Sequence, residues 1–147
     1  MKMAAMILAL LLAAAPAAAQ PDPAATFCRD LRRVIEAAEQ EGGFAALEVA
    51  RPTPPRLGFD HGCQATGDER QRYWVCSQNF APESMGVEAM AARVAGCLPD
   101  AVRGGRTMYR EASFTLPHAE IRLYEHGGPG AHVGRMVELV VESKPEG

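Results

Sequence analysis

Residues 62–76 read Gly-Cys-Gln-Ala-Thr-Gly-Asp-Glu-Arg-Gln-Arg-Tyr-Trp-Val-Cys, and the rest of the chain can be organised around this stretch. The pattern predicts two short strands joined by a polar turn, with one cysteine on each strand. A turn centred midway between the cysteines places Cys63 opposite Cys76. The same register places Ala65 opposite Trp74. Because directly opposed β positions have Cβ atoms roughly 4.5–5.5 Å apart, we predict a Cys63–Cys76 disulfide across the hairpin.

The N-terminus has the features of a secretory leader. Lys2 is followed by a short apolar run over residues 4–15, then by Pro16 and the small residues 17–19 of a possible cleavage site. The run is shorter than the about 20 apolar residues that a membrane-spanning helix needs. We therefore predict that residues 1–19 are a signal peptide, that the protein is periplasmic or secreted, and that no membrane span remains after cleavage. A retained membrane anchor is the alternative.

The four cysteines of the chain all lie after the predicted leader. An even number of cysteines in an exported domain predicts two disulfides. The Cys63–Cys76 pair leaves Cys28 to pair with Cys97. Cys28 lies near the start of one predicted helix and Cys97 near the end of another, so two antiparallel neighbouring helices would bring them together. Since a catalytic thiol must be unpaired, these pairings disfavour cysteine chemistry.

The remaining chain has the length of one domain. Residues 20–25 are predicted to be a flexible lead-in, residues 26–143 a single α+β domain, and residues 144–147 a tail. Without Lys2 the chain has 14 basic and 18 acidic residues, a net charge of −4. Charges of both signs are interspersed, whereas nucleic-acid binding needs a clustered basic surface. We therefore expect no nucleic-acid partner.

Hydrophobic periodicity predicts two helices, one from a Thr26 cap to the Gly42-Gly43 pair and one over residues 82–98. Strands are predicted at 44–50, in both halves of 62–76, and at 108–116, 119–123 and 137–142, with a loop at 99–106. The predicted fold class is α+β: a single antiparallel β-sheet of five to six strands with two helices packed on one face, in the order α-βββ-α-ββ(β), stabilised by disulfides. This element order resembles that of the type III secretion chaperones, and the resemblance implies a fold only.

The glycine-rich segment 127–134 connects the last two predicted strands. Glycine loops that bind phosphate lead into a helix, so a flexible hairpin loop is the better interpretation. His126 and His132 flank this loop and could form a metal site with His118. No histidine pair has a recognised ligand spacing, and exposed loop histidines are the simpler interpretation.

Tyr73 and Trp74 are neighbours in a predicted strand, so their side chains point to opposite faces of the sheet. One ring is expected in the core and the other on the open face, beside Arg70 and Arg72. Because aromatic residues and arginine are enriched at protein interfaces, these four residues form the predicted binding site.

The function predicted from these features is a small exported, disulfide-stabilised, non-enzymatic binding or interaction module of the cell envelope. Its expected partner is another envelope protein or a small ligand, and no cofactor is expected. The alternative is a small periplasmic hydrolase or metal-dependent enzyme that uses the loop histidines. Serine chemistry has no support, because none of the serines stands in a Gly-x-Ser-x-Gly motif.

Overall fold

A computed structural model describes residues 16–104 and 110–144. Most of the predicted signal peptide, the start of the strand predicted at 108–116 and the end of the predicted tail therefore lie outside the described residues. In chain order the elements are α1 (Pro23–Glu39), α2 (Ala45–Glu48), β1 (Cys63–Gly67), β2 (Arg72–Gln78), the short 3-10 helix η1 (Glu83–Met85), α3 (Val87–Cys97), β3 (Val102–Gly104), β4 (Glu111–Thr115), β5 (Ala119–Gly127) and β6 (Arg135–Ser143).

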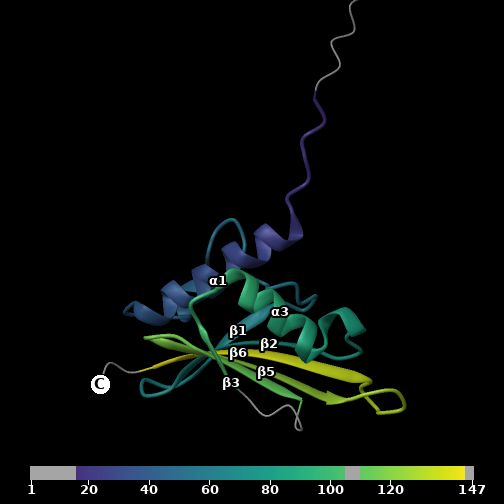
Figure 1. Cartoon of the computed structure of the whole chain (residues 1–147). Helices are drawn as coiled ribbons and strands as arrows, with labels where there is room; N and C mark the ends of the chain where they lie inside the picture. Colours follow the sequence, from purple (N-terminus) through teal and green to yellow (C-terminus); the bar gives the residue numbers. More distant parts are fainter. Residues whose placement is uncertain (1–15, 105–109, 145–147) are drawn as a thin grey trace, which may run out of the picture.

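The strands form one six-stranded antiparallel sheet in the order β1-β2-β6-β5-β4-β3. Figure 1 shows both main helices, α1 and α3, above this sheet. α1 contacts β5 and β6, whereas α3 contacts β4 and β5. The predicted α+β fold, with a single antiparallel sheet and two helices on one face, is confirmed.

The core lies between the sheet and the two helices because every second strand residue there is apolar. Trp74 on β2 and Leu139 on β6 are both 0 % exposed. Leu31 and Val34 of α1 are equally inaccessible to solvent on the opposite side of this layer. Burying a side chain of this size stabilises the fold by about 1.5–3 kcal/mol relative to leaving it exposed, so the alternating pattern determines which face of each strand meets the helices.

The central hairpin has the predicted register. Cys63 lies opposite Cys76, and Ala65 lies opposite Trp74. Both predicted disulfides are present: the Cα atoms are 4.2 Å apart in Cys63–Cys76 and 5.1 Å apart in Cys28–Cys97. The second bridge ties the N-terminal part of α1 to the last residue of α3.

α1 begins earlier than the sequence indicates. The side chain of Asp22, not Thr26, caps the helix, and its Oδ1 accepts a hydrogen bond of 3.1 Å from the Ala24 amide. Pro23 follows as the first helical residue, a position that suits proline because its missing amide hydrogen is not needed there. Residues 23–25 therefore belong to α1 and not to the lead-in.

The prediction of a strand at 44–50 is wrong, because this segment contains the one-turn helix α2. Phe44 and Leu47 are three residues apart and only 2 % and 8 % exposed, so one side of a helical turn buries both. The Phe44 ring lies 6.5 Å from that of Trp74. The two apolar residues of this segment therefore have the spacing of a short helix.

The loop predicted at 99–106 contains the strand β3, which pairs with β4. β3 has three residues, all of them exposed, and too few positions for an alternating pattern. The observed order is thus two helices, two strands, a helix and four strands, counting α2 and omitting η1. The resemblance to the element order of type III secretion chaperones depended on a strand at 44–50, which the chain lacks.

Candidate functional site

The face of the sheet opposite the helices, which we call the open face, is built from the strand residues that alternate with the core. At its centre Val75, Val140 and Arg122 lie side by side on β2, β6 and β5. Tyr73 occupies the neighbouring row on one side and Tyr124 the neighbouring row on the other. All five side chains are half-buried, so a partner could contact a patch of two valines and two tyrosines around one guanidinium.

Four carboxylates surround this centre: Glu111, Glu120, Glu138 and Glu142. Arg122 Nε lies 2.9 Å from Glu120 Oε1, and Arg122 Nη2 lies 3.3 Å from Glu142 Oε2. The hydrogen bond to Glu120 raises the pKa of Arg122 above its usual value, so the guanidinium remains charged. Arg122 thus pairs with two of the carboxylates, and its single positive charge offsets one of their two negative charges. Within the described residues Glu111 and Glu138 make no ion pair, which leaves the open face negatively charged.

The structure does not bring the four predicted binding residues to one surface. Tyr73 lies on the open face, whereas Trp74 is 0 % exposed and belongs to the core. Arg70 is exposed in the turn between β1 and β2. Arg72 alternates with Tyr73 and therefore lies on the helix side of the sheet. Its guanidinium packs against Gly43, since a Cβ atom added to Gly43 would be only 2.6 Å from Arg72 Nη1.

The three histidines of the predicted metal site are also separated. His118 precedes β5 and His126 lies near its other end, so about eight residues of extended chain, roughly 26 Å, separate them. His132 lies in the loop between β5 and β6. Among the residues that the structure describes, no three His, Cys, Asp or Glu side chains are grouped so that they could hold a metal ion. The His126 ring instead stacks on Tyr124 of the open face, with 6.2 Å between the ring centroids.

The glycine-rich segment joins β5 to β6, as predicted for a hairpin connection. Gly127 has a φ of +72°, and a Cβ atom there would be 2.2 Å from the carbonyl oxygen of Gly134. The same carbonyl accepts a hydrogen bond of 3.1 Å from the Gly128 amide. Glycine is required at position 127 because both the backbone conformation and the close approach of the two chains exclude a side chain.

Phe80 is a surface feature that the sequence did not indicate. It is 70 % exposed and has a φ of +52°, which is unusual for a residue with a side chain. Its amide donates a hydrogen bond of 2.9 Å to the Val133 carbonyl, and its ring lies against Gly134. No periodic pattern in the sequence marks such a residue, because its position depends on contacts with a loop that is distant in the sequence.

The state of the cysteines, the character of the helices and the comparisons with known proteins also bear on function. Both disulfides engage all four cysteines, so no free thiol is present. None of the helices within residues 16–104 and 110–144 has the length and apolarity needed to cross a membrane. No protein-family model, curated protein or solved structure matches this chain. The geometry of the open face is therefore the basis for the function that we propose.

Proposed function

We propose that this protein is a non-enzymatic binding module of the cell envelope and that the open face of its sheet contacts another protein. The supporting observation is the composition of this face, in which Val75 and Val140 lie between Tyr73 and Tyr124 and are bordered by carboxylates. Protein interfaces commonly have a core enriched in aromatic residues and a polar rim. A partner would bury the valines and the tyrosine rings and face the carboxylates with basic groups.

The rigidity of the scaffold favours binding at this face. β2 and β6 are central strands with hydrogen-bonded neighbours on both sides, and the Cys63–Cys76 disulfide links β2 to the edge strand β1. A surface that is already ordered loses little conformational entropy when a partner binds. The open face therefore needs less interaction energy for a given affinity than a flexible loop would.

The proposed location rests on the two disulfides, which persist in oxidising compartments, and on the leader-like residues 1–19. We propose export to the periplasm or secretion after cleavage of that leader. Intact mass of the protein recovered from the producing cells tests this proposal. A mass that begins at Gln20 and includes two disulfides is expected, whereas an uncleaved chain in the cytoplasm would contradict it.

The alternative, a hydrolase or metal-dependent enzyme that uses the loop histidines, has weaker support because β5 separates His118 from His126. Zinc analysis of the purified protein tests this alternative directly. One zinc ion per chain would favour the metal-dependent enzyme over the binding module.

Site-specific photo-crosslinking in the producing cells tests the binding face. A photoreactive residue replaces Val140 on the open face or, as a control, the exposed Arg32 on α1. We expect a discrete crosslinked protein from position 140 and not from position 32. Equal patterns from both positions, or no crosslinked protein from position 140, would contradict the proposal.

A pair of charge reversals sharpens this test. Glu111→Lys with Glu138→Lys changes two carboxylates of the open face that have no ion pair within the described part of the chain. Glu36→Lys with Glu83→Lys makes the same change in net charge at exposed sites on α1 and η1. Crosslinking from position 140 should fall in the first variant and persist in the second.

A further inference from the structure

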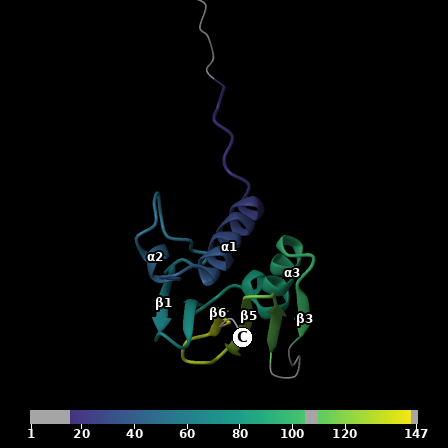
Figure 2. The same ribbon diagram turned by 90° about the vertical axis from the view of Figure 1, so that its left-hand side faces the viewer.

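A groove lies along the β1 edge of the sheet, apart from the open face. It has a volume of about 730 Å³, with α2 on one side and β1 on the other. Figure 2 shows β1 as the outermost strand at this end of the sheet, with α2 beside it. We call this hollow the edge groove; its lining includes Phe44, Ala45, Glu48, Ala65, Thr66 and Gly67.

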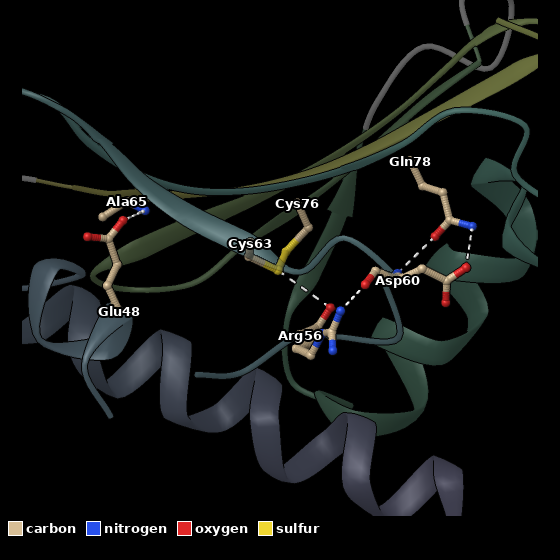
Figure 3. Close-up of a disulfide and its surroundings, with 7 residues drawn as sticks. All are labelled: Glu48, Arg56, Asp60, Cys63, Ala65, Cys76 and Gln78. Atoms are coloured by element: carbon tan, nitrogen blue, oxygen red, sulfur yellow. Dashed lines mark hydrogen bonds between the residues drawn. A yellow bond between two sulfur atoms is a disulfide. The ribbon is translucent and has the colours of Figure 1, made fainter. Parts of the chain in front are cut away.

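Every second residue of β1 directs its backbone amide and carbonyl groups toward the edge groove. Ala65 lies opposite Trp74, yet its amide donates a hydrogen bond of 2.9 Å to Glu48 Oε1 and not to β2 (Figure 3). The Cα separation of 4.2 Å between Cys63 and Cys76 also fits the narrow type of antiparallel pair, which exchanges no hydrogen bonds. Cys63, Ala65 and Gly67 therefore direct their amides and carbonyls away from β2.

These outward groups are largely unused in the described part of the chain. The Ala65 amide is bonded to Glu48, whereas the Ala65 carbonyl and the Gly67 amide take part in no hydrogen bond with a described residue. Unpaired groups on an edge strand can pair with another extended chain. The Glu48 carboxylate occupies the place that a carbonyl of such a chain would take.

We propose that the edge groove binds an extended, positively charged peptide segment of another protein, which adds to the sheet as a strand along β1. Main-chain hydrogen bonds to Ala65 and Gly67 would supply affinity, as in other cases of strand addition. Glu48 is exposed and lies on a helix of one turn, so it can release the Ala65 amide with little disturbance of the core.

The charge of the groove selects a basic occupant. Its rim carries Glu41, Glu48, Asp68 and Glu69 against the single cation Arg72. Glu41 and Glu69 make no ion pair with any residue of the described ranges. A second copy of this chain would bring the same carboxylates to the same edge, so like-charge repulsion disfavours pairing of β1 with itself.

This inference goes beyond the proposed function, because the edge groove and the open face are different surfaces. Loss of crosslinking at Val140 and loss of peptide binding at β1 are separate results. Either proposal can therefore fail while the other holds.

The test uses an acetylated and amidated peptide of alternating lysine and valine as the probe. Two matched probes accompany it: one replaces each lysine with glutamate, and one carries N-methyl groups on the amides that would face β1. We expect the lysine peptide to bind and to slow hydrogen exchange of the Gly67 amide, as measured by NMR. The other two probes should bind at least about tenfold more weakly, since one reverses the charge and the other removes the main-chain donors.

Two charge-reversal variants of the protein distinguish binding of the peptide at the edge groove from attraction of a cation by the net charge of the protein. Glu41→Lys with Glu69→Lys should weaken the lysine peptide at least about tenfold. Glu83→Lys with Asp100→Lys makes the same change in net charge at exposed sites beside α3 and should weaken it less than about twofold. Equal weakening by both pairs, or equal binding of the N-methylated probe, would overturn the proposal.

Ala65→Pro is the most direct variant, because it removes an amide hydrogen that does not bond to β2. Proline is tolerated at such outward positions of an edge strand. The variant should retain the hairpin and lose peptide binding; if it fails to fold, the two charge-reversal pairs decide. A protein that binds none of the probes, or that pairs with a second copy along β1 in sedimentation and NMR measurements, would overturn the proposal.

Discussion

The Glu125 carboxylate on β5 accepts a hydrogen bond of 3.1 Å from the amide of Val87, the first residue of α3. The preceding residue, Gly86, provides no side-chain cap of its own. The other oxygen of the same carboxylate lies 2.8 Å from Arg135 Nε on β6. One carboxylate of the sheet therefore caps the helix and pairs with the neighbouring strand.

Glu125→Ala should lower the free energy of unfolding by about 1–2 kcal/mol, because the variant loses the helix cap and leaves Arg135 half-buried without its partner. Glu125→Gln should cost less, since the amide oxygen can still accept from Val87. Urea denaturation provides the measurement, with Glu83→Ala at an exposed position of η1 as the control. A loss for Glu125→Ala no larger than that of the control would show that the cap does not stabilise α3.

The two disulfides should contribute unequally to stability. Cys28 and Cys97 are 69 residues apart and Cys63 and Cys76 are 13 residues apart. On the chain-entropy model, removing the long bridge costs over about 4 kcal/mol and removing the short one about 3 kcal/mol. Unfolding of the Cys28→Ala/Cys97→Ala and Cys63→Ala/Cys76→Ala variants in urea gives the comparison. The reverse ranking would mean that contacts within the hairpin, not closure of the long loop, dominate.

Trp74→Phe should destabilise the protein much less than Trp74→Ala. Trp74 is 0 % exposed, and its Nε1 has no hydrogen-bond partner among the described residues. Alanine creates a large cavity, at a typical cost of about 3–5 kcal/mol. Phenylalanine keeps most of the ring and removes the unsatisfied donor, so the expected cost is roughly 1 kcal/mol. Denaturation curves followed by circular dichroism measure both, and similar losses would show that the indole nitrogen is satisfied in solution.

The turn of the hairpin should make stability depend on pH. Hydrogen bonds from the amides of Arg70 and Gln71, at 2.7 and 3.0 Å, lower the pKa of Asp68 below its ordinary value of 3.8. A carboxyl group whose pKa is lower in the folded state stabilises the fold above its unfolded pKa, and this contribution disappears as the pH falls through the folded value.

The advantage of the wild type over Asp68→Asn should therefore be constant near neutral pH and shrink below about pH 4. Unfolding free energies of both proteins at several pH values test this expectation, because the other carboxyl groups affect both alike. An advantage that grows on acidification would contradict the sign of the pKa shift.

The hairpin of residues 62–76 could be predicted in detail because its determinants are local. The alternation of side chains and the symmetry of the turn placed Cys63 opposite Cys76, and the remaining pair followed by elimination. The segment 44–50 could not be assigned correctly, because Phe44 and Leu47 fit either a short strand or one helical turn. Contact with Trp74 favours the helix, and that contact is not visible in the sequence.

The sequence by itself determined the α+β class, the disulfide pairing and the alternation of buried and open positions along the strands after residue 110, because each depends on spacing along the chain. Only the tertiary structure decided which strands are neighbours where no hairpin connects them. The pairing of β2 with β6 brings Val75 into one row with Val140 and Arg122, although β2 is far from β5 and β6 in the sequence. Such rows form through hydrogen bonds between distant strands, and local periodicity carries no information on which strands those are.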